Sequence, residues 1–194
     1  SPRRTIRQTL LEPLRHFGIG DAATQNHRVL NVLETVGLDQ AALPRYPHQF
    51  SAGQQQRIAI ARAIITEPEL VIADEAVSSL DTSIQAQILG LIQDLQKDHG
   101  ITFLFVSHDL AVIRQIADEV AVMYRGQLLE QSPADIFFSN PAHPYSKMML
   151  SFANDNIPPG LENLKWGLDR GRSQNDGSEI CVFSELCQEK MPVC

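Results

Sequence analysis

The sequence predicts an α/β fold in which a helical region precedes a parallel sheet and its covering helices. Two short apolar runs, at residues 70–73 and 101–106, are typical of strands buried on both faces. Between them the apolar residues recur at helical spacing, and they are Ile84, Ile88, Leu91, Ile92 and Leu95. A strand, a helix and a second strand in this order predict the crossover unit of a parallel sheet. The composition agrees, because 43% of the 194 residues are hydrophobic, enough for one substantial core.

The helical region is predicted from the first 66 residues. Apolar residues at helical spacing predict two amphipathic helices between residues 5 and 36, the second of which ends at Gly37. A proline-containing loop over residues 43–50 then leads to a third helix. This helix is predicted to begin at Ser51 and to run to about Thr66.

Smaller elements are predicted after the second strand. A helix is expected over residues 111–116, and a small hairpin between residues 120 and 130. Ser132 is expected to cap a further helix with Pro133 at its first position. Residues 153–180 are polar and rich in Gly, Pro, Asn and Asp, which indicates a linker or loosely ordered tail. The predicted organisation is a helical region at 1–66, a core at 67–152 and a tail at 153–194.

The charge is unevenly distributed along the chain. The net charge is -7, yet residues 1–62 contain eight arginines and only four acidic residues. This basic region could meet an acidic partner or a phosphate, or its arginines could simply lie scattered on solvated helices. The overall charge does not favour nucleic-acid binding. No apolar run approaches the roughly 18 residues of a membrane span and no signal peptide is visible, so a cytosolic address is expected.

Two carboxylates follow the first predicted strand. Asp74 and Glu75 would lie at the carboxyl edge of a parallel sheet, where the ligands of such folds bind. An Asp there can hold Mg²⁺ through its water shell, and the next Glu can face a water that attacks a terminal phosphate. Acidic residues after a strand are also common without such a role, so the two residues alone leave both interpretations open.

The start of the third helix carries a second candidate site. Ser51 and Gln54 have the spacing of a capping box, which explains these two residues without any ligand. A capping box does not explain Gly53, because a glycine in a helix costs about 1 kcal/mol relative to alanine. A glycine at this position would let a phosphate approach the bare amides at the positive end of the helix dipole.

These motifs resemble those of ATP-binding cassette proteins. The stretch from Phe50 to Arg57 is similar to the family signature, and a Walker B motif, a D-loop and a switch histidine follow in family order. The Walker B motif ends at Asp74-Glu75, the D-loop ends at Asp81, and the switch histidine is His108. The resemblance implies the C-terminal part of a P-loop NTPase, with ATP and Mg²⁺ as ligands. It implies catalytic roles for Glu75 and His108, a magnesium role for Asp74, and nucleotide contacts across a dimer interface for Ser51, Gly53, Gln54 and Asp81.

A closer resemblance is to the ATPase subunits of importers for oligopeptides, dipeptides, nickel and glutathione. It rests on the segments 2–6, 46–50 and 140–145 and on the cysteine-containing tail. It implies uptake of peptides or related small solutes at the cytoplasmic face of the inner membrane. The implied partners are a second ATPase subunit, identical or not, two membrane permease subunits docked on residues 5–36 and, indirectly, an extracytoplasmic solute-binding protein. The sequence His143-Pro144-Tyr145 could alternatively be only a turn before a helix.

The sequence also departs from the family pattern. It contains no Gly-x-x-x-x-Gly-Lys phosphate loop, and no glycine is followed by lysine. We therefore expect the C-terminal part of a longer subunit that is inactive alone. Ala52 replaces the first glycine of the signature, and Ala76-Val77 replaces the usual Pro-Thr after the Walker B glutamate.

The three cysteines all lie within the last fourteen residues, which excludes a disulfide framework for the main body. They are Cys181, Cys187 and Cys194. Some related importer ATPases have a fourth cysteine and hold an iron-sulfur cluster, so the resemblance implies a 4Fe-4S cluster. Three thiolates leave such a cluster, or a zinc ion, one ligand short unless a continuation of the chain supplies it. The alternative is that the tail cysteines are inert.

Two other functions remain open at this point. One is a cassette ATPase outside transport, but such proteins carry long coiled coils or tandem cassettes, and neither pattern occurs in this sequence. The other is a degenerate fragment that binds a partner through its basic helical face. The intact residues Ser51, Asp74, Glu75 and His108 argue against long decay.

Overall fold

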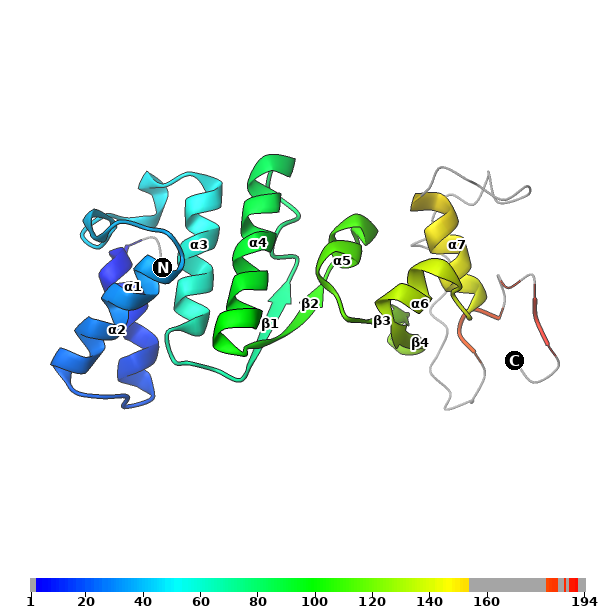
Figure 1. The fold of residues 1–194 in the computed structure, drawn as a ribbon, viewed down its shortest axis with the longest axis horizontal. Coiled ribbons are helices and arrows are strands. Elements are labelled where there is room, and N and C mark those ends of the chain that lie inside the picture. Colours follow the sequence, from blue (N-terminus) through cyan, green and yellow to red (C-terminus); the bar gives the residue numbers. More distant parts are fainter. Residues whose placement is uncertain (1–2, 154–180, 185–186, 188, 192–194) are drawn as a thin grey trace. The chain divides into compact units, whose positions relative to one another are not determined.

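The computed structural model describes residues 3–153, 181–184, 187 and 189–191, and the chain divides into two compact units, Ser1–His108 and Asp109–Cys194. The first unit contains the helical region and the parallel sheet (Figure 1). In chain order its elements are α1 Ile6–His16, α2 Ala22–Thr35, the 3-10 turns Gln40–Ala42 and Pro47–Gln49, α3 Ala52–Ile64, β1 Leu70–Asp74, α4 Thr82–His99 and β2 Thr102–Val106.

The three N-terminal helices begin at capping residues and pack through their apolar stripes. Thr5 and Asp21 cap α1 and α2, respectively, by accepting hydrogen bonds from backbone N–H groups of the first turn. The stripes predicted from the sequence are fully buried at Leu10, Leu14 and Leu33. Helices α1, α2 and α3 contact one another, and α3 also contacts α4. The prediction of two amphipathic helices followed by a third is therefore confirmed.

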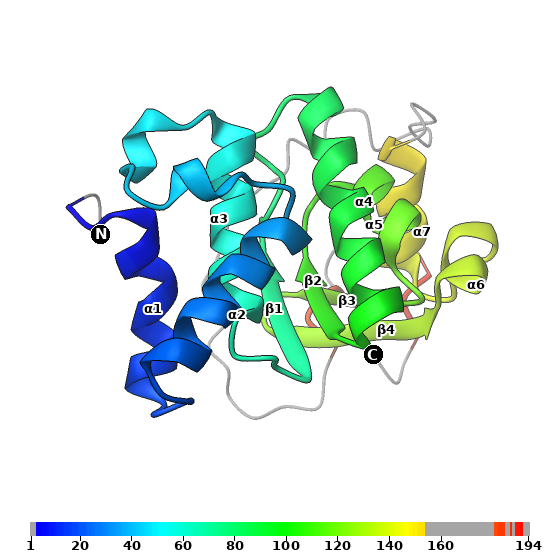
Figure 2. The ribbon, with the colours of Figure 1, turned by 60° about the vertical axis from the view of Figure 1, so that its left-hand side comes forward.

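The strands β1 and β2 pair in parallel, and α4 connects them (Figure 2). Asp81 caps α4 at its N-terminus, and Gly100 ends the helix with a φ of +64°, which glycine adopts without a steric penalty. The register places Ile72 opposite Leu104 and Asp74 opposite Val106. The predicted crossover unit is confirmed, and it brings the residues after both strands to the same edge.

The prediction that both strands are buried on both faces is wrong for this unit. Leu70, Ile72 and Leu104 are 53%, 66% and 52% exposed, whereas the residues that alternate with them are half-buried. Successive side chains of a strand point to opposite faces, so this alternation shows that only one face of the pair is packed. The physical reason is that the described sheet of this unit has two strands and lacks cover on its second face.

The second unit is built on an antiparallel hairpin. Its elements are α5 Leu110–Ile116, β3 Glu119–Tyr124, β4 Gln127–Pro133, α6 Ala134–Ser139 and α7 Pro144–Ala153. The predicted hairpin is confirmed, but the expected cap of α6 is wrong. Ser132 pairs with Val120 inside β4, and Pro133 occupies the N-cap position without a side-chain bond. Pairing with β3 holds Ser132 in extended backbone, so the helix begins one residue later than expected.

None of the helices in the described part of the chain is both long and apolar enough to cross a membrane. The predicted linker lies outside the described residues from residue 154 to residue 180. The division into regions 1–66, 67–152 and 153–194 stays a prediction.

Candidate functional site

The backbone at Glu75 is held in an unusual conformation at the edge of the sheet. Its φ is +50°, a region that residues other than glycine rarely adopt. Its N–H donates to the carbonyl oxygen of Val106 at 2.9 Å, which extends the pairing of β1 with β2 by one residue. The hydroxyl of Ser78 donates to the Glu75 carbonyl oxygen at 3.1 Å. Strained backbone of this kind persists only where the surrounding contacts hold it, and it is concentrated at functional sites.

The side chains of Glu75 and His108 contact each other. Nδ1 of His108 lies 2.8 Å from Oε1 of Glu75, although the residues are 33 positions apart. The parallel register explains the contact, because Glu75 follows β1 directly and His108 comes two residues after β2. The two side chains are 41% and 78% exposed, so the pair is open to solvent.

The pair has a defined protonation pattern. The hydrogen bond from His108 lowers the pKa of Glu75 below its ordinary value and outweighs the opposing effect of desolvation. Glu75 is therefore ionised at neutral pH. An ionised carboxylate only accepts hydrogen bonds, so Nδ1 of His108 carries the proton that it donates. A carboxylate oriented by an imidazole at a sheet edge can accept a proton from a water molecule.

Asp74 lies at the same edge as this pair. It is the last residue of β1, it is exposed, and its register partner is Val106 at the end of β2. Carboxylate oxygens are ligands that suit Mg²⁺, which retains several waters when bound to one or two carboxylates. The donor chemistry of Asp74 therefore fits the magnesium role predicted for it, and that role stays a prediction.

The predicted capping box at the start of α3 is present. The Gln54 N–H donates to Ser51 Oγ at 3.3 Å, and the Ser51 N–H donates to Gln54 Oε1 at 3.1 Å. The first turn of α3 contains no acidic residue, so no carboxylate there offsets the positive end of its dipole. Ser51 and Gln54 thus have a structural role that explains both residues, and their predicted contacts with a nucleotide stay predictions.

Gly53 has a packing role that the sequence did not indicate. It is buried, and a Cβ atom added to it would lie 2.5 Å from Cγ2 of Ile84 on α4. No pattern in the sequence signals this contact, since Gly53 and Ile84 are 31 positions apart on separate helices. The phosphate role predicted for Gly53 stays a prediction beside this packing role.

Asp81 is an exposed helix cap. Its Oδ1 accepts from the N–H of Ile84 at 3.0 Å, as expected of an N-cap residue. Its predicted role at a dimer interface stays a prediction.

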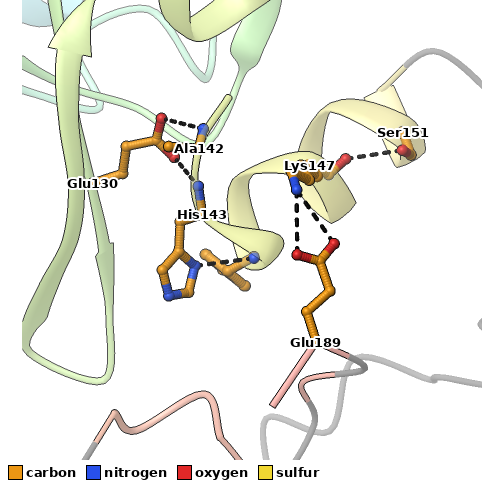
Figure 3. Close-up of polar contacts among 7 residues, drawn as sticks. Glu130, Ala142, His143, Lys147, Ser151 and Glu189 are labelled. Atoms are coloured by element: carbon orange, nitrogen blue, oxygen red, sulfur yellow. Dashed lines mark hydrogen bonds and ion pairs between the residues drawn. The ribbon is translucent and has the colours of Figure 1, made fainter. Parts of the chain in front are cut away.

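The sequence His143-Pro144-Tyr145 joins a hydrogen-bonded turn to the start of α7 in the second unit, and Figure 3 shows the turn at Ala142 and His143. The buried carboxylate of Glu130 accepts from the backbone N–H groups of Ala142 and His143 at 2.8 and 2.9 Å. Nδ1 of His143 in turn accepts from the N–H of Tyr145 at 3.0 Å. The ring of Tyr145 packs against Tyr124 and Phe183. The motif therefore holds the turn before α7 on the hairpin.

Glu130 was missed by the sequence reasoning. The available signal was an acidic residue placed in a strand, at a position that the hairpin buries. Burial raises the pKa of Glu130, but the Ser146 hydroxyl and the two backbone N–H groups together outweigh it and hold the pKa below its ordinary value. Burial also lowers the pKa of His143, which keeps its ring neutral and its Nδ1 able to accept.

The tail cysteines give no support to the implied cluster. Sγ of Cys181 lies 3.8 Å from Nε2 of His143, and Cys187 is half-buried. Within the described residues, no three His, Cys, Asp or Glu side chains are grouped so as to hold a metal ion. Because Nδ1 of His143 accepts a hydrogen bond, its neutral ring carries the proton on Nε2, which therefore cannot also be a metal ligand. Cys194 lies outside the described residues.

A parallel strand–helix–strand unit with carboxylates and a histidine at its carboxyl edge agrees with the P-loop NTPase core that the resemblance implies, and the comparisons with known proteins support this class. The family model described as ABC transporter matches residues 1–78, and the model described as the C-terminal region of oligopeptide/dipeptide transporters matches residues 129–194. The chain belongs to the ABC transporter ATPase family, in the group with this oligopeptide/dipeptide transporter region.

Several curated relatives support this membership. The oligopeptide transport ATP-binding protein OppF of Lactococcus lactis subsp. lactis is 50% identical over 151 residues, which are 78% of this chain and 47% of the relative. AppF of Bacillus subtilis, another oligopeptide transport ATP-binding protein, is 40% identical over 196 residues, 100% of this chain and 60% of the relative. The glutathione import ATP-binding protein GsiA of Salmonella typhimurium is 49% identical over 77% of this chain and 24% of its own length. The chain thus spans from about a quarter to three fifths of these relatives.

A solved structure has the same fold. The ATP-binding cassette MJ0796, as a dimer in a post-hydrolysis state with ADP and Pi, matches with a TM-score of 0.60 and 28% identity. The match covers 69% of this chain and 58% of that one. It supports the assignment to the ATP-binding cassette fold.

Proposed function

We propose that this chain is the signature and hydrolysis part of the ATP-hydrolysing subunit of an importer for peptides or related small solutes. The observation that carries the proposal is the contact between Glu75 and His108 at the carboxyl edge of a parallel pair of strands. The match of residues 129–194 to the oligopeptide/dipeptide transporter region favours an importer over a cassette ATPase outside transport.

In this proposal Glu75 is the general base. Its lowered pKa keeps the carboxylate ionised, so it accepts a proton from the water that attacks the terminal phosphate of ATP. His108 orients Glu75 through Nδ1, which makes Nε2 the ring nitrogen that contacts the phosphate. When bound, Mg²⁺ neutralises charge on the phosphates, and Asp74 is the residue that would hold it. Ser51, Gly53, Gln54 and Asp81 would face the nucleotide of a second ATPase subunit.

The partners and the location follow from the same proposal. Two membrane permease subunits would bind the helices of residues 5–36, and a solute-binding protein would act with them. The complex would lie at the cytoplasmic face of the inner membrane. Relatives named for oligopeptide transport and glutathione import support a peptide-like solute. An iron-sulfur cluster is not part of the proposal.

The experiment compares this chain with a complete subunit, meaning a polypeptide in which a phosphate-loop half precedes the same 194 residues. That half can be taken from a related ATP-binding protein such as L. lactis OppF and fused before Ser1. We expect no turnover by the 194 residues alone, because most phosphate contacts are unmade without the loop. We expect ATP hydrolysis by the complete subunit, measured as steady-state phosphate release.

The decisive variant is Glu75→Gln in the complete subunit. Loss of the base should reduce hydrolysis by about 100-fold or more, while ATP still drives dimerisation because the nucleotide contacts remain. Light scattering with and without ATP measures the dimer. Hydrolysis at the parent rate by Glu75→Gln would contradict the role of Glu75. Steady hydrolysis by the 194 residues alone that Glu75→Gln abolishes would contradict the need for a phosphate loop.

A further inference from the structure

The contact between Gly53 and Ile84 joins the first turns of two helices. Gly53 is the second residue of α3, and Ile84 is the third residue of α4. A Cβ at Gly53 would lie 2.5 Å from Cγ2 of Ile84, far inside the separation of about 3.5–4.0 Å at which carbon atoms attract. Gly53 lies within a regular α-helix, so glycine is needed here for space and not for its backbone freedom.

Each of these first turns begins with a residue that the proposed function places at the dimer interface. Ser51 caps α3, and Asp81 caps α4. The backbone N–H of Ile84 donates to Oδ1 of Asp81, the cap of α4. The side chain of Ile84 packs against Gly53 in the first turn of α3, which Ser51 caps. Ile84 therefore contacts both helix starts. Both caps are exposed, whereas Gly53 is buried and Ile84 half-buried behind them.

We infer that Ile84 is a positioning residue that fixes the Ser51 end of α3 against the Asp81 end of α4, and that Gly53 is required for this close approach. The inference rests on the proposed function, in which both caps contact the same partner subunit. If both caps contact the partner subunit at the same time, the distance between them must be fixed. Small misplacements of contacting groups weaken binding and slow the reaction. Ile84 itself contacts no nucleotide in this scheme.

The packing part is tested on the 194-residue chain by thermal unfolding. Alanine in place of glycine inside a helix raises stability where space is free, so Gly90→Ala is the matched control because nothing lies within 4 Å of its Cβ position. We expect Gly90→Ala to raise Tm by about 2 °C and Gly53→Ala to lower it by about 5 °C, since overpacking a closed contact is destabilising. In the Ile84→Ala background, Gly53→Ala should no longer lower Tm. A rise in Tm for Gly53→Ala alone, or no rescue by Ile84→Ala, would overturn the inference.

The positioning part is tested in the complete subunit with Glu75→Gln, by ATP-dependent dimerisation. We expect Ile84→Ala to weaken dimerisation about 10-fold and to leave binding of a fluorescent ATP analogue to the monomer unchanged. Ile84→Val should restore dimerisation, because valine retains a γ-methyl group at the contact. Undiminished dimerisation of Ile84→Ala would overturn the positioning role. If Glu75→Gln with the native Ile84 shows no ATP-dependent dimer, the proposed function fails instead, and the two failures are thereby distinguished.

Discussion

Each unit of the molecule contains a glutamate close to a histidine, and the two arrangements differ in exposure, in hydrogen-bond partners and in backbone conformation. In the first unit the side chains of Glu75 and His108 bond directly, are open to solvent and start from backbone with a φ of +50° at Glu75. In the second unit the Glu130 carboxylate is buried and accepts from the backbone N–H groups of Ala142 and His143 (Figure 3).

The two histidines use the same ring nitrogen in opposite ways. Nδ1 of His108 donates to a carboxylate, whereas Nδ1 of His143 accepts from the Tyr145 backbone. A carboxylate bonded by backbone amides holds a turn together, and an exposed carboxylate oriented by an imidazole is available for proton transfer. Glu130 is therefore expected to act in stability and Glu75 in proton transfer, and the following predictions test this difference.

The largest expected effect on stability is at Glu130. Glu130→Ala leaves two part-buried N–H groups without their acceptor and removes a buried side chain, which should lower the free energy of unfolding by about 1–3 kcal/mol. Glu75→Ala is the matched control and should change stability little, because its side chain is open to solvent. Urea unfolding of the 194-residue chain measures both variants. An equal decrease in the free energy of unfolding for both variants would contradict the different roles of Glu130 and Glu75.

A smaller effect with the opposite sign is expected from Glu75→Gly. Glycine adopts positive φ without the steric penalty that glutamate carries, so Tm should rise by about 2 °C. The complete subunit with the same change should lose ATP hydrolysis. Differential scanning calorimetry and phosphate release measure the two properties, and a lower Tm for this variant would show that the backbone at residue 75 is not strained.

Ala52→Gly tests the cap of α3 against its phosphate role. If Ser51 and Gln54 only cap the helix, the change should lower stability by up to about 1 kcal/mol and leave hydrolysis by the complete subunit unaltered. If the amides near Gly53 hold a phosphate, removal of the Ala52 methyl should preserve or raise hydrolysis despite that loss. Ser51→Arg sharpens the test, because a bulky side chain at residue 51 should obstruct a phosphate bound there. Hydrolysis at the parent rate by a stably folded Ser51→Arg dimer would show that the start of α3 takes no part in the reaction.

The smallest expected effect is on the titration of Glu75. His108→Ala should raise the Glu75 pKa toward its ordinary value, whereas His143→Ala should leave it unchanged. Because the folded pKa is the lower one, the pair stabilises the fold above the unfolded pKa and loses this contribution as pH falls through the folded pKa. Solvent screening keeps the contribution small. Carboxyl ¹³C NMR titration measures the shift, and an unmoved Glu75 pKa in His108→Ala would contradict the assigned hydrogen bond.

The sequence by itself determined the local elements and the principal site residues. Helical spacing and two apolar runs predicted α1 to α4 and the parallel pair, because hydrophobic periodicity is a property of neighbouring residues. The placement of Glu75 and His108 at one edge of the sheet followed as well, since parallel strands end at the same edge and the two residues come one and two positions after a strand. Family motifs then gave these two residues their expected roles.

The tertiary structure alone decided what depends on contacts between distant segments. The steric need for Gly53 arises from Ile84 on another helix, and no spacing rule connects the two residues. The role of Glu130 depends on a turn that folds back onto its strand, and Ser132 was drawn into β4 by pairing with Val120. The exposed face of β1 and β2 was equally invisible, because an apolar run specifies that a strand is apolar and not what covers it.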